Sequence, residues 1–360
     1  MRKNSVRTAP YPKPQRVASL DALRGVAVLL MITQHVAFWI TAEPGSSWVI
    51  QVTGALGGLA APLFVTLSGI GAVLLSERHP NADRLFFVRG LLIMVFGYLM
   101  NVLTPHWFTL GSWYVLHMIG AALIMAPLLR RVPDFAMILM AAAVMVATGL
   151  LQSYLNMPFR LFNDHMAAQV QLGGVLRYAL VEGFFPIFPW IAFFMAGILA
   201  GRWLISARMD KLLVFGTVLV GTAVILSATY FSGADFTRSE PWVRYFRLQS
   251  SFYSALAPLS LLLMGLSLLF VAAFSALQKK ISFSPSDVLV CLGRASLTLL
   301  IVHVALIRES AVYLNFWKIL PAVPTLVATA GVLLFFSLAA LAWQKIAFRY
   351  GFEWLLRKVG

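Results

Sequence analysis

The chain of 360 residues has 60% hydrophobic and only 11% charged side chains, with a mean hydropathy of +0.85. Soluble domains have about 45–50% apolar and about 25% charged residues, so this composition excludes a soluble domain and indicates a membrane protein. At about 20 residues per spanning helix, the length allows about ten to twelve crossings and leaves little for a separate soluble domain. The single cysteine, Cys291, excludes an intrachain disulfide, a multi-cysteine zinc site and an iron–sulfur cluster.

Apolar runs of spanning length predict an all-α polytopic membrane protein with about ten transmembrane helices. In chain order the predicted helices are 19–41, 49–76, 85–103, 111–129, 134–155, 183–204, 211–230, 254–277, 288–307 and 322–344. Residues 1–18 are expected to be a disordered cytoplasmic tail, residues 19–347 the transmembrane domain, and residues 348–360 an interfacial segment that mixes aromatic with basic side chains. The first apolar run has no small-residue cleavage site after it, so it is expected to remain as an anchor.

The net charge of +15 is typical of nucleic-acid binders, but the positions of the basic residues favour another explanation. Counted over alternate flanks of the predicted helices, 20 basic residues fall on the side of the N-terminus and seven on the other, with Arg294 inside a helix. By the positive-inside rule, this distribution predicts that both termini are cytoplasmic. The chain has no N-x-S/T sequon, which fits a bacterial cytoplasmic (inner) membrane.

Ionisable residues within predicted spans are costly in lipid, so each is a functional hypothesis. The residues that stand out are Arg24, His35, Arg89, His117, Arg294 and His303. At a rise of about 1.5 Å per residue, the arginines fall within about 10 Å of the cytoplasmic surface and the histidines in the outer half of the membrane. Arginine suits phosphate binding and neutral histidine suits proton abstraction. The pattern fits a molecule with a phosphorylated head in the cytoplasm and a reactive tip that reaches outward.

Each of these residues also has an interpretation without catalysis. Arginines near the cytoplasmic ends of helices often extend to lipid headgroups, and a membrane histidine often only hydrogen-bonds to a neighbouring helix. Asp21 either caps the first helix or pairs with Arg24 three residues later. Gly197 and Gly201 fit helix packing better than ligand binding.

Five segments carry a family resemblance. The first is the run Arg16-Val-Ala-Ser-Leu-Asp-Ala-Leu-Arg-Gly-Val-Ala-Val-Leu-Leu-Met31, which is followed by His35. The others, in order, are residues 61–69, 113–120, 188–190 with 197 and 201–202, and 292–297 with 303. Together they resemble the heparan-alpha-glucosaminide N-acetyltransferase-like membrane proteins, which belong to the wider transmembrane acyltransferases. The resemblance extends over nearly the whole chain.

The resemblance implies an acyltransferase that takes an acetyl group from cytoplasmic acetyl-CoA and transfers it across the membrane to a sugar amine or hydroxyl. It implies that His35 is catalytic, and we favour a general base over a nucleophile that carries the acetyl group. His117 and His303 are secondary catalytic candidates, which would orient the acceptor or His35. The residues expected to bind the donor are Arg24, Arg89, Arg294, Arg202 and Ser68.

Acetyl-CoA is therefore the expected co-substrate, and no metal is expected. The expected partners are the lipid bilayer and a sugar or glycan acceptor, not nucleic acid, and a homodimer is left open. Outer segments 156–182 and 231–253 are long enough to shape an acceptor site. In the second, Trp242, Tyr245, Phe246 and Tyr253 are expected either to stack on sugar faces or to form a membrane belt.

The competing function is that of a secondary transporter for a small polar or sugar-like substrate. Such transporters usually couple ions through acidic residues within their spans. Acidic residues are nearly absent from the predicted spans here, with Asp21 and Glu182 near span ends, which favours the acyltransferase.

Overall fold

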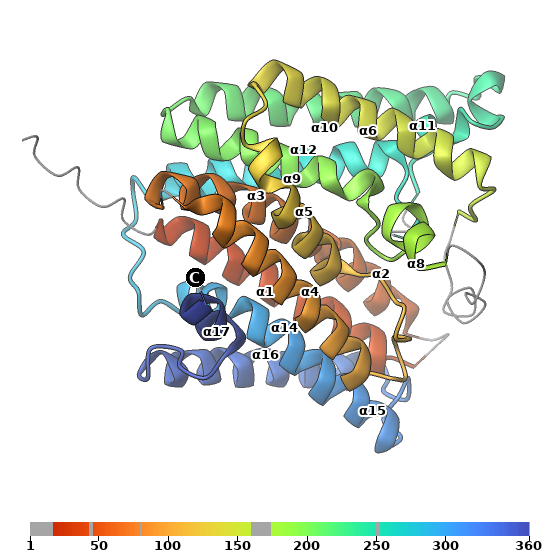
Figure 1. Ribbon diagram of the computed structural model, residues 1–360. Coiled ribbons are helices and arrows are strands. Elements are labelled where there is room, and N and C mark those ends of the chain that lie inside the picture. Colours follow the sequence, from red (N-terminus) through yellow and green to blue (C-terminus); the bar gives the residue numbers. More distant parts are fainter. Residues whose placement is uncertain (1–16, 43–45, 80, 160–173, 250–252, 360) are drawn as a thin grey trace, which may run out of the picture.

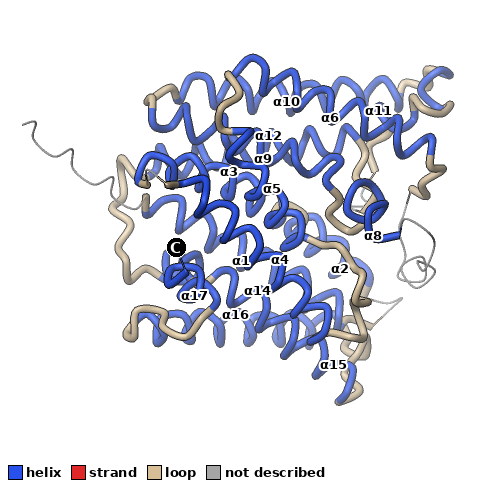
Figure 2. The backbone as a smooth tube through the Cα atoms, in the orientation of Figure 1, coloured by secondary structure: helices blue, strands red, loops and turns tan. Residues whose placement is uncertain are grey.

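The computed structural model describes residues 17–42, 46–79, 81–159, 174–249 and 253–359 (Figure 1). These residues form helices joined by loops, and none of them belongs to a strand (Figure 2). Nine helical segments among them are long and apolar enough to span a membrane. A further apolar helix is only 15 residues long. The protein is thus an all-α, multi-pass membrane protein, as the composition predicts.

The helices follow the predicted spans closely over most of the chain. Those of the N-terminal part are α1 (Ala18–Ile40), α2 (Ser47–Gly57), α3 (Ala60–Arg78), α4 (Ala82–Leu103), α5 (Val115–Leu129), α6 (Asp134–Tyr154) and α8 (Gly174–Arg177). Those of the C-terminal part are α9 (Ile187–Ile205), α10 (Met209–Phe231), α11 (Val243–Phe246), α12 (Ala257–Leu277), α13 (Val288–Arg294), α14 (Ser296–His303), α15 (Glu309–Tyr313), α16 (Ala322–Gln344) and α17 (Phe352–Val359). Two π-helical turns, η1 (Tyr178–Glu182) and η3 (Val304–Arg308), and one 3-10 turn, η2 (Asp235–Arg238), complete them.

Three predicted spans differ from the observed helices. The span 49–76 is divided between α2 and α3 at Gly58 and Leu59, since glycine weakens a helix interior. The span 111–129 begins only at Val115, and the preceding residues form turns. The span 288–307 is broken at Ala295 and continues through η3 and α15 to Tyr313. Hydropathy does not detect these breaks because the residues around them are also apolar.

Close helix crossings place α1, α3 and α9 at the centre of the bundle, while α6 with α10 and α16 lie on opposite outer sides (Figure 1). α9 is the most buried span, and α10 and α16 are the least buried. A Cβ atom on Gly69 would overlap the carbonyl oxygen of Phe194, and one on Gly197 would overlap that of Thr66. Small residues therefore let α3 and α9 pack backbone against backbone, which confirms the packing interpretation of Gly197.

A second close crossing joins α1 to α13. A Cβ atom on Gly25 would overlap the carbonyl oxygen of Leu289, and one on Gly293 would overlap that of Asp21. Arg24 directly precedes Gly25, and Arg294 directly follows Gly293. The same crossing therefore brings the two arginines to one end of the bundle.

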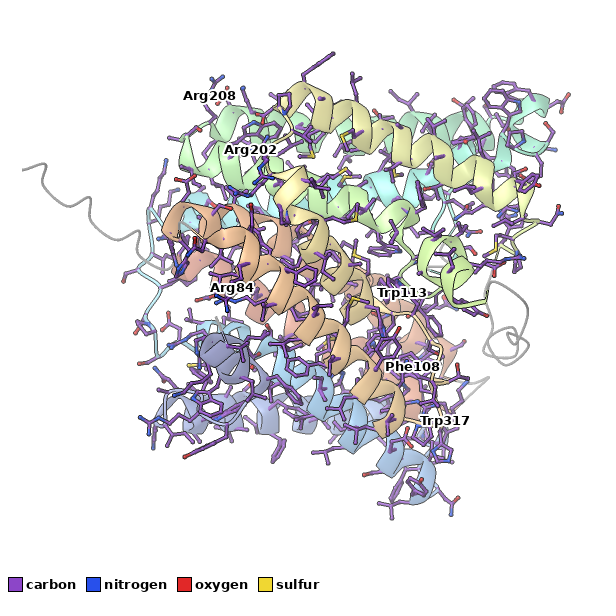
Figure 3. The ribbon with its side chains drawn as sticks, in the orientation of Figure 1. Arg84, Phe108, Trp113, Arg202, Arg208 and Trp317 are labelled. Carbon is purple, nitrogen blue, oxygen red and sulfur yellow. The ribbon has the colours of Figure 1, made fainter. Side chains whose placement is uncertain are left out.

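The two ends of the bundle carry different side chains. Figure 3 shows Arg84, Arg202 and Arg208 near one end and Phe108, Trp113 and Trp317 near the other. The chain also ends at the arginine end, where α17 packs against α14 and α4 (Figure 1). Residues 1–16 of the predicted tail lie outside the described residues, and α1 begins at Ala18.

Candidate functional site

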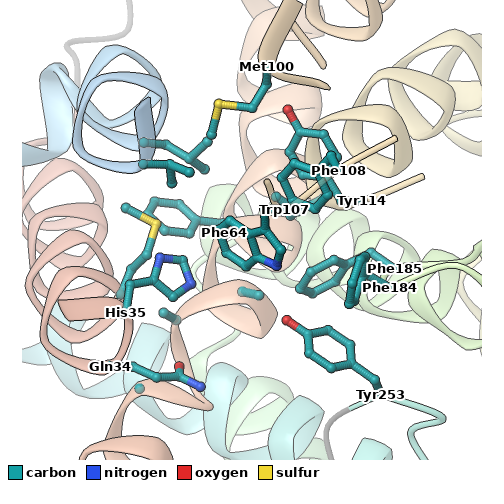
Figure 4. A pocket seen from close by; sticks show the side chains of 17 residues that line it. Gln34, His35, Phe64, Met100, Trp107, Phe108, Tyr114, Phe184, Phe185 and Tyr253 are labelled. Atoms are coloured by element: carbon teal, nitrogen blue, oxygen red, sulfur yellow. The ribbon is translucent and has the colours of Figure 1, made fainter. Parts of the chain in front are cut away.

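A cavity lies at the aromatic end of the bundle (Figure 4), with about 700 Å³ of space between its atoms when space open to solvent is included. We call it the aromatic cavity, since its walls include Phe64, Trp107, Phe108, Tyr114, Phe184, Phe185 and Tyr253. Gln34 and His35 of α1 supply polar atoms to the same cavity. None of the described residues that line it is an Asp, Glu, Lys or Arg. Burial raises the pKa of Tyr253 to about 12, so its hydroxyl stays neutral at physiological pH.

His35 forms a hydrogen-bonded pair with His303 of α14. Nδ1 of His35 lies 2.9 Å from Nε2 of His303. Nδ1 of His303 lies 2.8 Å from the carbonyl oxygen of Leu299, and because a carbonyl only accepts, this nitrogen is the donor. With both rings neutral, Nε2 of His303 must then accept from Nδ1 of His35. Nε2 of His35 keeps its lone pair, and His35 is the member of the pair that lines the aromatic cavity.

Two tryptophans hold the His35 ring. The rings of Trp39 and His35 stack with their centres 5.1 Å apart, and Trp107 meets His35 edge to face at 5.5 Å. Trp107 in turn contacts the guanidinium of Arg308, which lies 5.5 Å from the centre of its ring. Arg308 is paired with Glu309 at 2.8 Å. The His35 ring is therefore fixed on several sides before any ligand binds.

His117 lies in a different environment from the His35–His303 pair. The backbone N–H of Tyr114 donates to Nδ1 of His117 at 3.3 Å, so this ring caps the N-terminus of α5. Its ring is stacked on Trp113 and meets Tyr98 edge to face. His117 does not line the aromatic cavity, although its neighbour Tyr114 does. The observed contacts give His117 a structural role.

A second cavity occupies the opposite end of the bundle and encloses about 1600 Å³, part of it open to solvent. We call it the arginine cavity because five arginines line it: Arg24, Arg78, Arg89, Arg294 and Arg357. Asp21 and Glu353 are the carboxylates in its lining. Positive side chains thus outnumber negative ones, and fields of one sign in a concave site attract ligands of the other sign.

The predicted donor-binding residues mostly meet in the arginine cavity. Of the two alternatives for Asp21, the structure shows the ion pair, with Arg24 at 3.1 Å. Arg24 also donates to the carbonyl oxygen of Leu67 at 3.3 Å. Nε of Arg89 is buried and has no hydrogen-bond partner among the described residues. Ser68 lines the cavity too, with its hydroxyl donating to the carbonyl oxygen of Phe64 at 2.8 Å.

Arg202 does not line either cavity. Its guanidinium pairs with Asp134 at 2.7 Å and donates to the carbonyl oxygens of Val132 and Arg130 at 2.8 and 2.7 Å. These contacts hold the end of α9 against the loop between α5 and α6. The geometry therefore gives Arg202 a structural position, apart from the other predicted donor-binding residues.

The two cavities lie along the same helices and are separated by one to two helical turns. On α3, Phe64 lines the aromatic cavity and Ser68 the arginine cavity. On α14 the corresponding residues are Leu300 and Ser296, again four residues apart. Four residues span about 6 Å along a helix. A narrow wall of side chains thus divides one end of the bundle from the other.

Some lining residues were not predicted from the sequence. Arg78 shares a face of α3 with Ser68, Gly71 and Leu75, and this helical spacing was a usable signal. Of the four outer aromatic residues singled out in segment 231–253, Tyr253 lines the aromatic cavity, whereas Tyr245 bonds to the carbonyl oxygen of Val146. Residues 160–173 of the other outer segment lie outside the described residues.

The comparisons with known proteins agree with this geometry. Residues 16–230 match the family model described as heparan-alpha-glucosaminide N-acetyltransferase, catalytic. No curated protein matches the chain closely enough to count as a relative. The matched residues include Arg24, His35 and Arg89. Arg294 and His303 lie beyond them: the fold places Arg294 in the lining of the arginine cavity and His303 against His35. The match favours acetyl transfer over the transporter, and the chain belongs to the heparan-alpha-glucosaminide N-acetyltransferase catalytic family of transmembrane acetyltransferases.

Proposed function

We propose that this protein transfers an acetyl group from acetyl-CoA, bound in the arginine cavity, to a sugar in the aromatic cavity. The observation that carries the proposal is the placement of two chemically different cavities along one set of helices, with one to two helical turns between them. The donor supplies the acetyl group as a thioester: the new bond to the acceptor forms while the carbon–sulfur bond breaks and CoA leaves as the thiol.

The arginine cavity fits the phosphorylated part of CoA. Arg24, Arg89 and Arg294 would hold phosphate oxygens, because a guanidinium binds phosphate through two parallel hydrogen bonds. The buried Nε of Arg89 supports this role, since a buried donor without a partner is costly and a phosphate oxygen would satisfy it. Ser68 offers a further hydroxyl at the wall that faces the aromatic cavity.

The orientation follows from the charges. We place the arginine cavity at the cytoplasmic side, because basic side chains are retained there and because CoA is a cytoplasmic metabolite. Both chain ends then face the cytoplasm, and the aromatic cavity faces the other side. An extended pantetheine arm has to cross the wall between Ser68 and Phe64 to bring the thioester near His35.

His35 is the general base of the proposed reaction. Its Nε2 lone pair would take the proton from the acceptor hydroxyl or amine as that atom attacks the acetyl carbon. His303 is a positioning residue, because its bond to the Leu299 carbonyl determines which nitrogen of His35 carries the hydrogen. The aromatic walls support a sugar acceptor, since flat side chains stack on the apolar faces of pyranose rings while Gln34 and Tyr253 offer hydrogen bonds.

The test is acetyl transfer by purified protein in proteoliposomes with labelled acetyl-CoA outside and candidate monosaccharides inside. Wild-type protein should acetylate the enclosed sugar, and His35→Ala should lower the rate by about 10²–10⁴-fold while binding CoA normally. Full activity in His35→Ala contradicts the assigned role. Release of the enclosed sugar from the proteoliposomes without acetylation would instead support a transporter.

A second measurement distinguishes whether His35 acts as a general base or as a nucleophile. Wild-type protein is incubated with labelled acetyl-CoA and no acceptor, then examined for label on the protein under conditions that preserve acetyl-imidazole. The general-base role predicts no stoichiometric label. Label that is absent in His35→Ala and is transferred to added sugar would contradict that role and show a two-step relay.

A further inference from the structure

The short C-terminal helix α17 lies against the arginine cavity, although its sequence predicts an interfacial segment. Glu353, Leu356 and Arg357 of this helix line the cavity. Phe352 packs edge to face on Phe96 of α4, with ring centres 4.8 Å apart. The helix is thus part of the wall of the cavity as well as the last element of the chain.

Glu353 connects α17 to the broken span. Its Oε1 accepts from the backbone N–H groups of Leu297 and Thr298 at 2.6 and 3.1 Å, and its Oε2 accepts from the Thr298 hydroxyl at 2.5 Å. The break at Ala295 exposes these N–H groups at the start of α14, where they need an acceptor. A carboxylate at a helix N-terminus also interacts favourably with the helix dipole. Burial raises the pKa of the Glu353 carboxyl, and these hydrogen bonds oppose that rise.

The turn before α17 is held in place by contacts with the rest of the bundle. Phe348 is almost fully buried, and its ring lies 4.8 Å from the guanidinium carbon of Arg294. Ala347, Phe348 and Tyr350 have φ values of 55°, 52° and 67°. A left-handed backbone is unfavourable for residues other than glycine, because their Cβ atom crowds the following carbonyl oxygen. Such a turn persists only because tertiary contacts, including those of Phe348 and Glu353, stabilise it.

Arg357 follows Glu353 by four residues, so both lie on the same face of α17. We propose that α17 completes the donor site, with Arg357 as a donor-binding residue and Glu353 as a positioning residue that holds the helix on α14. This inference rests on the proposed function, because it takes acetyl-CoA as the ligand of the arginine cavity. Arg357 adds a fifth element, after α1, α3, α4 and α13, from which an arginine lines the arginine cavity.

The test measures CoA affinity by calorimetry in detergent, with the full-length protein. Arg357→Gln should weaken CoA binding by about three- to tenfold, between the effect of an exposed ion pair and that of a buried charged hydrogen bond. The matched control is Lys358→Gln, which removes the same charge from the next residue of α17. Lys358 contacts Trp354 and does not line the cavity. The Lys358→Gln variant should therefore bind CoA with the wild-type affinity.

A double-mutant cycle tests the positioning role of Glu353. Glu353→Ala should weaken CoA binding at least as much as Arg357→Gln, and Glu353→Gln should restore part of the affinity because its amide oxygen still accepts a hydrogen bond. In the Glu353→Ala background, Arg357→Gln should have almost no further effect, because the helix no longer holds residue 357 in the cavity. Thermal unfolding without CoA checks that each variant is folded.

The outcomes separate the inference from the function on which it rests. Equal CoA affinities for Arg357→Gln and Lys358→Gln, in a background where wild-type protein binds CoA, overturn the inference and leave the proposed function intact. Fold-changes that multiply in the double variant overturn the positioning role of Glu353. Failure of wild-type protein to bind CoA overturns both.

Discussion

Replacement of His303 tests whether the histidine pair acts as a unit. His303 is fully buried, so His303→Leu keeps an apolar side chain of comparable volume in place while it removes the acceptor for Nδ1 of His35. Loss of one hydrogen bond costs about 0.5–1.5 kcal/mol, which alone corresponds to about a two- to twelvefold change in rate. Loss of the orientation of the His35 ring lowers the rate further. The largest possible effect is that of removing the general base altogether, about 10²–10⁴-fold in rate.

We therefore expect His303→Leu to lower kcat for acetyl transfer by at least about tenfold, with little change in KM for acetyl-CoA. His303→Gln, whose side-chain oxygen can accept the same bond, should retain most of the activity. Steady-state kinetics with labelled acetyl-CoA measures both variants, and thermal unfolding checks their stability. Wild-type kcat in His303→Leu would refute the positioning argument. Equal loss in the Gln and Leu variants, at unchanged stability, would show that the accepted hydrogen bond is not what matters.

Three further outcomes are expected. Arg24→Gln and Arg89→Gln should each weaken CoA binding, measured by calorimetry, by about 10- to 150-fold, which corresponds to about 1.5–3 kcal/mol for a charged hydrogen bond. Unchanged affinity in both variants would place the donor elsewhere. Arg202→Gln should lower the melting temperature, because it removes the ion pair with Asp134 and leaves that carboxylate only its hydrogen bond from Trp203, yet it should keep CoA affinity; the reverse result would return Arg202 to the donor site. Gly293→Val should destabilise the protein by about 1–3 kcal/mol or more in thermal unfolding, since α1 and α13 must move apart. Gly331→Ala is the control: no atom lies within 4 Å of the added Cβ, so this variant should be as stable as the wild type or more stable.

The spans and the types of residue available for chemistry can be read from the sequence alone. Lipid offers no hydrogen-bond partners to a polypeptide, so a spanning segment has to be apolar and helical, and hydropathy detects it directly. For the same reason, the few ionisable residues within spans are visible in the sequence. Rise per residue along a helix was enough to separate Arg24 from His35 by depth, and these two residues do line different cavities.

Tertiary structure decided which of these residues meet. His35 and His303 are 268 positions apart and form a 2.9 Å contact, while His117, at a similar predicted depth, caps a helix instead. A side chain that faces lipid and one that is buried against another helix are equally apolar. Hydropathy therefore does not show how each helix is rotated about its own axis. The small residues at the crossings, Gly25 with Gly293 and Gly69 with Gly197, determine that rotation only once the partner helix is known.

The break at Ala295 and the docking of α17 required the structure for a related reason. A carboxylate at residue 353 is common on an interfacial helix, and nothing nearby in the sequence indicates that it accepts from the backbone of Leu297 and Thr298. The need for that acceptor arises only when the span is interrupted. The interruption lies directly after the close crossing of α13 with α1 at Gly293. Local sequence determines where helices form, but the hydrogen bonds at their interrupted ends depend on which distant segment folds against them.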